Sequence, residues 1–177
     1  FDYWMLVLAL DQQGKLEALQ SIVEQLEKTY PQRTITTIAK GLIQLDHDKS
    51  VEQLQEIDFS KIGVLHAIGA YGRLCLKSGL PTQGEASLLH AIRQGVATSA
   101  DRAQLANYYH EQKSNEEALR VLRTVGLQRG ELSWQVLRLK ILVALGLEVE
   151  VIQQANQVLS QDSTHSTALS ALEKFSS

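Results

Sequence analysis

One pattern of apolar and small residues recurs along this chain at intervals of about 34 residues, and it constrains the fold more than any other feature. Its clearest copy consists of Leu105, Ala106, Tyr109, Ala118, Leu122 and Val125. A repeat of this length is typical of stacked helical hairpins, because a single hairpin cannot bury its apolar face without a neighbour. The pattern therefore predicts an all-α array of helical pairs, which favours a binding scaffold over an enzyme.

The corners between paired helices fix the phase of the repeat. We assign them to Gly14, Gly79, Lys113 and Gly146, which are separated by 65, 34 and 33 residues. The first interval is close to two repeats, so a degenerate unit is expected at 32–60 with its corner near Asp46-His47-Asp48. The predicted helical pairs occupy residues 1–31, 32–60, 61–96, 97–129 and 130–162, and a single capping helix follows at 164–176.

Helix-start signals agree with this phase. The sequences Ser50-x-x-Gln53, Thr82-x-x-Glu85 and Ser114-x-x-Glu117 each match a capping box, in which two side chains satisfy free backbone N–H groups at a helix start. All three fall where the second helix of a pair is expected to begin.

These residues resemble the tetratricopeptide repeat family over nearly the whole chain. The best match is the unit around Leu105 and Ala118, and Trp134, Leu137 and Gly146 match in the next unit. The resemblance implies a right-handed α-α superhelix whose first helices line a concave groove. The sequence departs from the family at Lys113, which stands at a glycine corner, and at Gly84, near an expected alanine. Sel1-like and HEAT arrays therefore remain alternatives.

Composition and charge narrow the classes of partner. The net charge is −3 and the pI about 6.0, which opposes binding to nucleic acid or to an anionic membrane. The longest apolar run, residues 3–10, is far shorter than the roughly 20 residues of a membrane-spanning helix, so no membrane insertion is expected. The single cysteine, Cys75, cannot form an internal disulfide and is expected to be buried. The compartment stays open between bacterial periplasm and cytoplasm.

The start of the chain lies inside a helical pattern and lacks Met, so we interpret the sequence as a fragment of a longer protein. Phe1 and Trp4 would then be bare at the cut end. Such an apolar end would allow two copies to associate as a homodimer.

The sequence offers no site for catalysis. No histidine is followed three or four residues later by a second metal-ligand type, and Asp46-His47-Asp48 is interpreted as an exposed loop. Nucleotide-binding and nucleophile-elbow motifs are missing from the sequence. We therefore predict no catalytic residue, no metal and no cofactor.

The resemblance leaves a groove as the candidate binding surface. Arg73 and Lys77 lie four residues apart on one helical face and are expected to be exposed, so that their loss would not affect stability. Such cations beside an Asn amide could hold an acidic or chain-terminal peptide segment, as in the carboxylate clamp of some tetratricopeptide domains. The predicted groove residues are His66, Arg73, Lys77, Asn107, His110 and Lys140. An apolar groove, supported by Leu76, Val136 and Val143 near the same side, is the competing interpretation.

Two functions follow as hypotheses. The first is a non-catalytic scaffold that binds a protein or peptide partner in its concave groove. The alternative is a structural segment of a bacterial envelope assembly. Such a segment would be similar to repeat-rich lipoproteins that serve exopolysaccharide export or the sorting of proteins to the outer surface.

Overall fold

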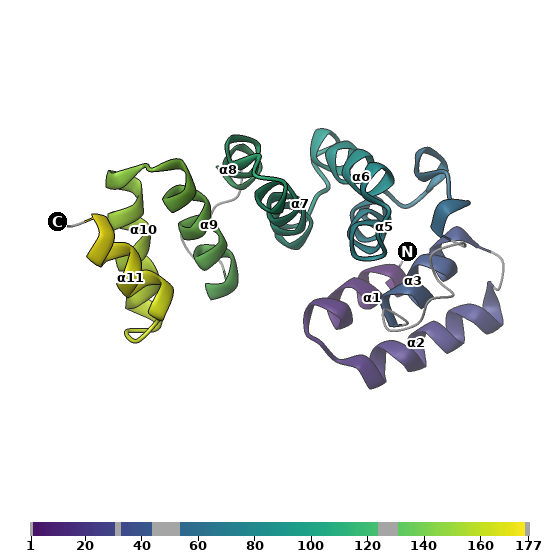
Figure 1. Cartoon of the computed structure of the whole chain (residues 1–177). Coiled ribbons are helices and arrows are strands. Elements are labelled where there is room, and N and C mark those ends of the chain that lie inside the picture. Colours follow the sequence, from purple (N-terminus) through teal and green to yellow (C-terminus); the bar gives the residue numbers. More distant parts are fainter. Residues whose placement is uncertain (1, 31–32, 44–53, 124–130, 176–177) are drawn as a thin grey trace. The chain divides into compact units, whose positions relative to one another are not determined.

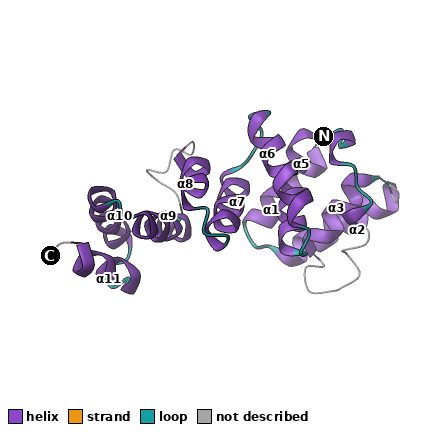
Figure 2. Cartoon of the chain, turned by 45° about the horizontal axis from the view of Figure 1, so that its top comes forward, coloured by secondary structure: helices purple, strands orange, loops and turns teal. Residues whose placement is uncertain are grey.

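The computed structural model describes residues 2–30, 33–43, 54–123 and 131–175. Within these ranges every regular element is a helix and no strand is present, as Figure 2 shows. The all-α prediction is therefore confirmed, whereas the right-handed superhelical arrangement stays a prediction. The helices are α1 (Asp2–Gln12), α2 (Leu16–Thr29), α3 (Thr34–Ile43), α5 (Leu65–Lys77), α6 (Pro81–Arg93), α7 (Ser99–Glu111), α8 (Asn115–Arg123), α9 (Leu132–Leu145), α10 (Glu148–Gln161) and α11 (Ser166–Phe175), with a 3-10 turn η1 at Phe59–Lys61.

The chain divides into two compact units, Phe1–Asp101 and Arg102–Ser177. The first compact unit contains α1 to α6 and the start of α7, and the second contains the rest of α7 and α8 to α11 (Figure 1). The predicted single array over residues 1–177 stays a prediction, as do its repeat boundaries.

The four predicted corners have left-handed backbone conformations, which confirms them. Their φ angles are +64° at Gly14, +76° at Gly79, +61° at Lys113 and +68° at Gly146. Among the described residues Lys113 is the single non-glycine with a positive φ. The predicted corner near residue 47 lies outside the described residues.

Each corner closes with the same pair of backbone hydrogen bonds, known as a Schellman motif. At the third pair, the Gly79 N–H donates to the Leu76 carbonyl at 3.4 Å and the next N–H donates to the Cys75 carbonyl at 2.8 Å. The N–H groups of Lys113 and Ser114 donate in the same way to His110 and Tyr109, both at 2.9 Å. The corners are therefore alike in geometry as well as in spacing.

The first compact unit has one apolar core to which most of its helices contribute. Helix α1 packs on α2 and α3, α3 also contacts α5, and α5 packs along α6. Trp4 is only 3% exposed, so the expectation that it is bare at the chain start is wrong. Its ring is covered because α1 is apolar on more than one side and is enclosed by two other helices. The largest buried side chains of this core include Leu19, Ile38, Leu54, Ile68, Tyr71 and Leu74.

Glycines allow α5 and α6 to approach each other closely. A Cβ on Gly72 would lie 2.7 Å from Leu88 Cγ, and one on Gly84 would lie 2.8 Å from the backbone nitrogen of Leu76. The residues 34 positions later are Ala106 and Ala118, both fully buried. Gly84 therefore occupies a position where a small residue lets two helices approach, and the helices are closer here than alanine would permit.

One of the predicted helix starts is wrong. Helix α6 begins at Pro81, with Leu80 at the cap position, so the Thr82 motif lies inside the helix. Proline suits a first helical position because the N–H that it lacks has no partner there in any helix. Ser114 does precede the first residue of α8, whereas the motif at residues 50–53 lies outside the described residues.

In the second compact unit α9 packs between neighbours. It contacts α8, α10 and α11, and α11 also contacts α10. Ala168 and Ala171 of α11 are buried. The three- and four-residue spacing of Trp134, Leu137, Ile141 and Leu145 predicts that these residues form one buried stripe of α9, and this prediction is partly wrong. Ile141 is buried, but Trp134, Leu137 and Leu145 are only half-buried, and the other buried positions of the helix are Gln135, Leu139 and Leu142. Because neighbours contact α9 on several sides, a single stripe does not describe its buried face.

Candidate interaction surface

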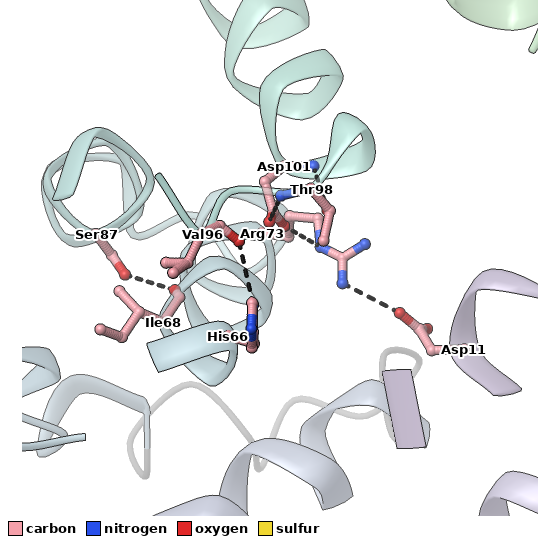
Figure 3. Close-up of polar contacts among 8 residues, drawn as sticks. All are labelled: Asp11, His66, Ile68, Arg73, Ser87, Val96, Thr98 and Asp101. Atoms are coloured by element: carbon pink, nitrogen blue, oxygen red, sulfur yellow. Dashed lines mark hydrogen bonds and ion pairs between the residues drawn. The ribbon is translucent and has the colours of Figure 1, made fainter. Parts of the chain in front are cut away.

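Arg73 of α5 joins two other helices by ion pairs (Figure 3). Its Nη2 lies 3.2 Å from Oδ2 of Asp11 in α1, and its Nε lies 3.1 Å from Oδ1 of Asp101 in α7. The Arg73 side chain is 12% exposed and that of Asp101 only 2%. The expectation that Arg73 is an exposed cation is therefore wrong, because carboxylates of α1 and α7 pair with it.

Asp101 also caps the start of α7. Its Oδ2 accepts a hydrogen bond from the Thr98 N–H at 2.7 Å, and the Asp101 N–H donates to Thr98 Oγ1 at 3.2 Å. This reciprocal arrangement is a capping box with aspartate in the place of glutamate. The spacing Thr98-x-x-Asp101 is present in the sequence. It does not match a capping box whose last position is restricted to Glu or Gln, so it was not predicted from the sequence.

Gly69 provides the space that the Asp101 carboxylate occupies. A Cβ on Gly69 would lie 2.3 Å from Oδ2 and 2.6 Å from Cγ of Asp101. The carboxylate thus rests against the backbone of α5, one turn from Arg73. This position needs glycine for a close approach and not for an unusual backbone angle.

The other two predicted groove residues of the first compact unit differ in exposure. His66 is half-buried, and its Nδ1 lies 3.4 Å from the Val96 carbonyl oxygen (Figure 3). Lys77 is exposed at the end of α5 and forms no ion pair with the described residues. Of the first compact unit's three predicted residues, Lys77 is the one that presents a charge to solvent.

In the second compact unit the predicted residues lie on α7 and α9. Asn107 is half-buried and donates from Nδ2 to Oε1 of Glu111 at 2.7 Å. His110 Nδ1 lies 2.6 Å from Oδ1 of Asn115, a contact that links the end of α7 to the start of α8. Lys140 is exposed. No hydrogen bond or ion pair joins any two of the six predicted groove residues, all of which are described, so their shared binding role stays a prediction.

Two hollows were missed by the sequence reasoning, because each is lined by residues from several elements. One, of about 450 Å³, lies in the first compact unit beside the start of α3. The other, of about 460 Å³, lies in the second compact unit between α8 and the corner that joins α9 to α10. Glu116, Glu117 and Arg120 line the second hollow together with three leucines.

The buried polar groups of α5 serve structure. The Tyr71 hydroxyl donates to the carbonyl oxygens of Leu54 at 2.9 Å and Ile57 at 3.2 Å. Burial raises the pKa of this hydroxyl and also that of the nearby Cys75 thiol. Cys75 is fully buried, which confirms that prediction. Both groups stay protonated at neutral pH, so neither is an activated nucleophile.

Within the described ranges, no group of three or more His, Cys, Asp or Glu side chains is placed to hold a metal ion. In those same ranges no helix has the length and apolar character needed to cross a membrane. Comparison with models of known protein families, with curated proteins and with solved structures finds no match. The tetratricopeptide resemblance therefore rests on the residues of this chain.

Proposed function

We propose that this chain is a non-catalytic scaffold that binds a peptide or protein partner along the first helices of a tetratricopeptide-like array. The supporting observation is the repeated corner, with left-handed residues at Gly79, Lys113 and Gly146 separated by 34 and 33 residues. Because the corners have the same backbone conformation and nearly the same spacing, residues one repeat apart lie at the same distance in sequence from their corners. They therefore occupy equivalent positions on their helices. A partner that extends along such helices would meet the same position in each pair.

Asn107 and Lys140 are the residues best suited to this role. They are 33 residues apart and occupy equivalent positions in α7 and α9. The Asn107 amide keeps its carbonyl oxygen for a peptide N–H while its Nδ2 bonds to Glu111. Lys140 is exposed and would contact a partner carboxylate or carbonyl. Arg73, one repeat earlier, is engaged by two carboxylates and is assigned a structural role.

The test compares two double variants of the full chain. Asn107→Ala with Lys140→Ala removes the proposed contacts on first helices, whereas Asn156→Ala with Lys28→Ala removes the same residue types from exposed positions on second helices. Partners captured by the wild type are purified and titrated against both variants.

We expect the first variant to weaken the partner's binding about tenfold or more, since two polar contacts are lost, and the second to leave it unchanged. Equal binding by both variants would refute the proposed surface. Capture of cell-wall or export components, without dependence on Asn107 and Lys140, would favour the structural envelope segment instead.

A further inference from the structure

Aliphatic and cationic side chains both line the hollow beside the start of α3. Its lining includes Leu26 of α2, Ile35 of α3, and Ile62 and Val64 on either side of Gly63, between η1 and α5. The volume of about 450 Å³ lies within the range of small-molecule sites, roughly 300 to 1,000 Å³. The hollow therefore has the size of a ligand site, and aliphatic side chains form part of its lining.

The charged groups at this hollow are of one sign. Arg33 and Lys61 line it, and none of the described lining residues is acidic. The guanidinium of Arg33 lies 4.5 Å from the centroid of the Tyr30 ring, which is also in the lining and holds the cation at the rim. Lys61 Nζ contacts Asp58 at 3.1 Å, but both side chains are largely solvent-exposed, so this pair is weak and can be exchanged for another anion.

Trp4 forms part of the wall of the hollow. It is among the lining residues and is 3% exposed, so its ring lies beside the aliphatic side chains of the lining. An occupant of the hollow would change the environment of this indole.

We propose that this hollow binds a small apolar carboxylate, meaning a carboxylic acid with an aryl or alkyl group. Arg33 and Lys61 would hold the carboxylate, and the aliphatic side chains would enclose the apolar group. The proposal uses none of the residues assigned to the peptide surface, so each can fail while the other stands.

The experiment uses Trp4 as the reporter. The chain contains two tryptophans, so Trp134→Phe in the second compact unit leaves Trp4 as the single indole. This variant is titrated with 3-phenylpropionate and with the neutral 3-phenylpropionamide, by tryptophan emission and by calorimetry. A tripeptide that ends in phenylalanine with a free carboxylate is a third probe.

We expect 3-phenylpropionate to change the Trp4 emission saturably and to bind about tenfold or more tightly than the amide, because a charge-assisted contact is lost in the amide. Arg33→Gln with Lys61→Gln should remove this preference, whereas Lys15→Gln with Lys28→Gln, exposed lysines outside the lining, should keep it. Asn107→Ala with Lys140→Ala should also keep it.

The proposal would be overturned by no saturable change with any probe, by equal affinity for acid and amide, or by binding that is unaffected by loss of both cations. Binding of the tripeptide with no binding of 3-phenylpropionate would also overturn it, because the occupant would then be a peptide end and not a small molecule.

Discussion

The contact between Gly69 and Asp101 leads to our sharpest prediction. In Gly69→Ala the new Cβ would lie 2.3 Å from Asp101 Oδ2, whereas ordinary van der Waals contact begins at 3.4 Å. The obstacle is a carboxylate held by the Thr98 backbone and by Arg73, so it cannot move without breaking those contacts. We therefore expect this substitution to destabilise the chain, although alanine is normally the better helix former.

The magnitude follows from the contacts that are displaced. Loss of a helix cap costs about 1 kcal/mol, and disruption of a buried ion pair costs about 3 kcal/mol when one charge loses its partner. Arg73 keeps its second partner, Asp11, so we take about 3 kcal/mol for both losses together. The gain in helix propensity from glycine to alanine offsets about 1 kcal/mol. Gly69→Ala should thus lower the free energy of unfolding by about 2 kcal/mol.

A double-mutant cycle isolates the cause. Asp101→Ala should lower the free energy of unfolding by about 3 kcal/mol, and adding Gly69→Ala to it should then raise stability by about 1 kcal/mol, because the obstacle is gone. Urea unfolding followed by circular dichroism measures all four proteins. If Gly69→Ala is equally destabilising in both backgrounds, the Asp101 carboxylate is not what requires glycine at this position.

Three further predictions concern single side chains. Lys113→Gly should raise the free energy of unfolding by about 1 kcal/mol in urea titrations, because glycine adopts the left-handed corner without strain; no gain would argue against a strained lysine. Ser87→Ala should lower it by about 1 kcal/mol, since the buried hydroxyl donates to the Ile68 carbonyl at 2.7 Å, and an unchanged melting curve would contradict this. Cys75, whose pKa is raised by burial, should react with iodoacetamide at least about tenfold more slowly in the native chain than in urea, as measured by mass spectrometry; equal rates would mean that the thiol is accessible.

The helix corners could be read from the sequence because they are local. The geometry of a corner depends on the φ angle of the left-handed residue that ends the helix and on hydrogen bonds to carbonyl groups of the preceding turn. Glycine at residues 14, 79 and 146 therefore marked three corners directly, and the repeat interval located Lys113, whose side chain gave no such signal. The prediction that Cys75 is buried was also correct, because unpaired cysteine is among the residue types most often buried.

The environment of Arg73 could not be read in this way. The helical spacing of the sequence places Arg73 on one face of its helix. Whether that face meets water or a carboxylate depends on which other helices pack against it. Asp11 is 62 residues away in the sequence, and no spacing rule relates the two. The same holds for Trp4, which looked like the bare end of a chain and is enclosed by other helices.

The sequence by itself determined the helical content and the phase of the corners, because backbone hydrogen bonds and glycine conformations depend on neighbours a few residues away. The tertiary structure decided which polar side chains stay at the surface and which line a hollow. The hollow is lined from three segments: Trp4 in α1, Tyr30 and Arg33 between α2 and α3, and Lys61 in η1. These segments meet only after the helices pack. Burial and charge pairing depend on contacts between distant parts of the chain, and those contacts exist only in the folded molecule.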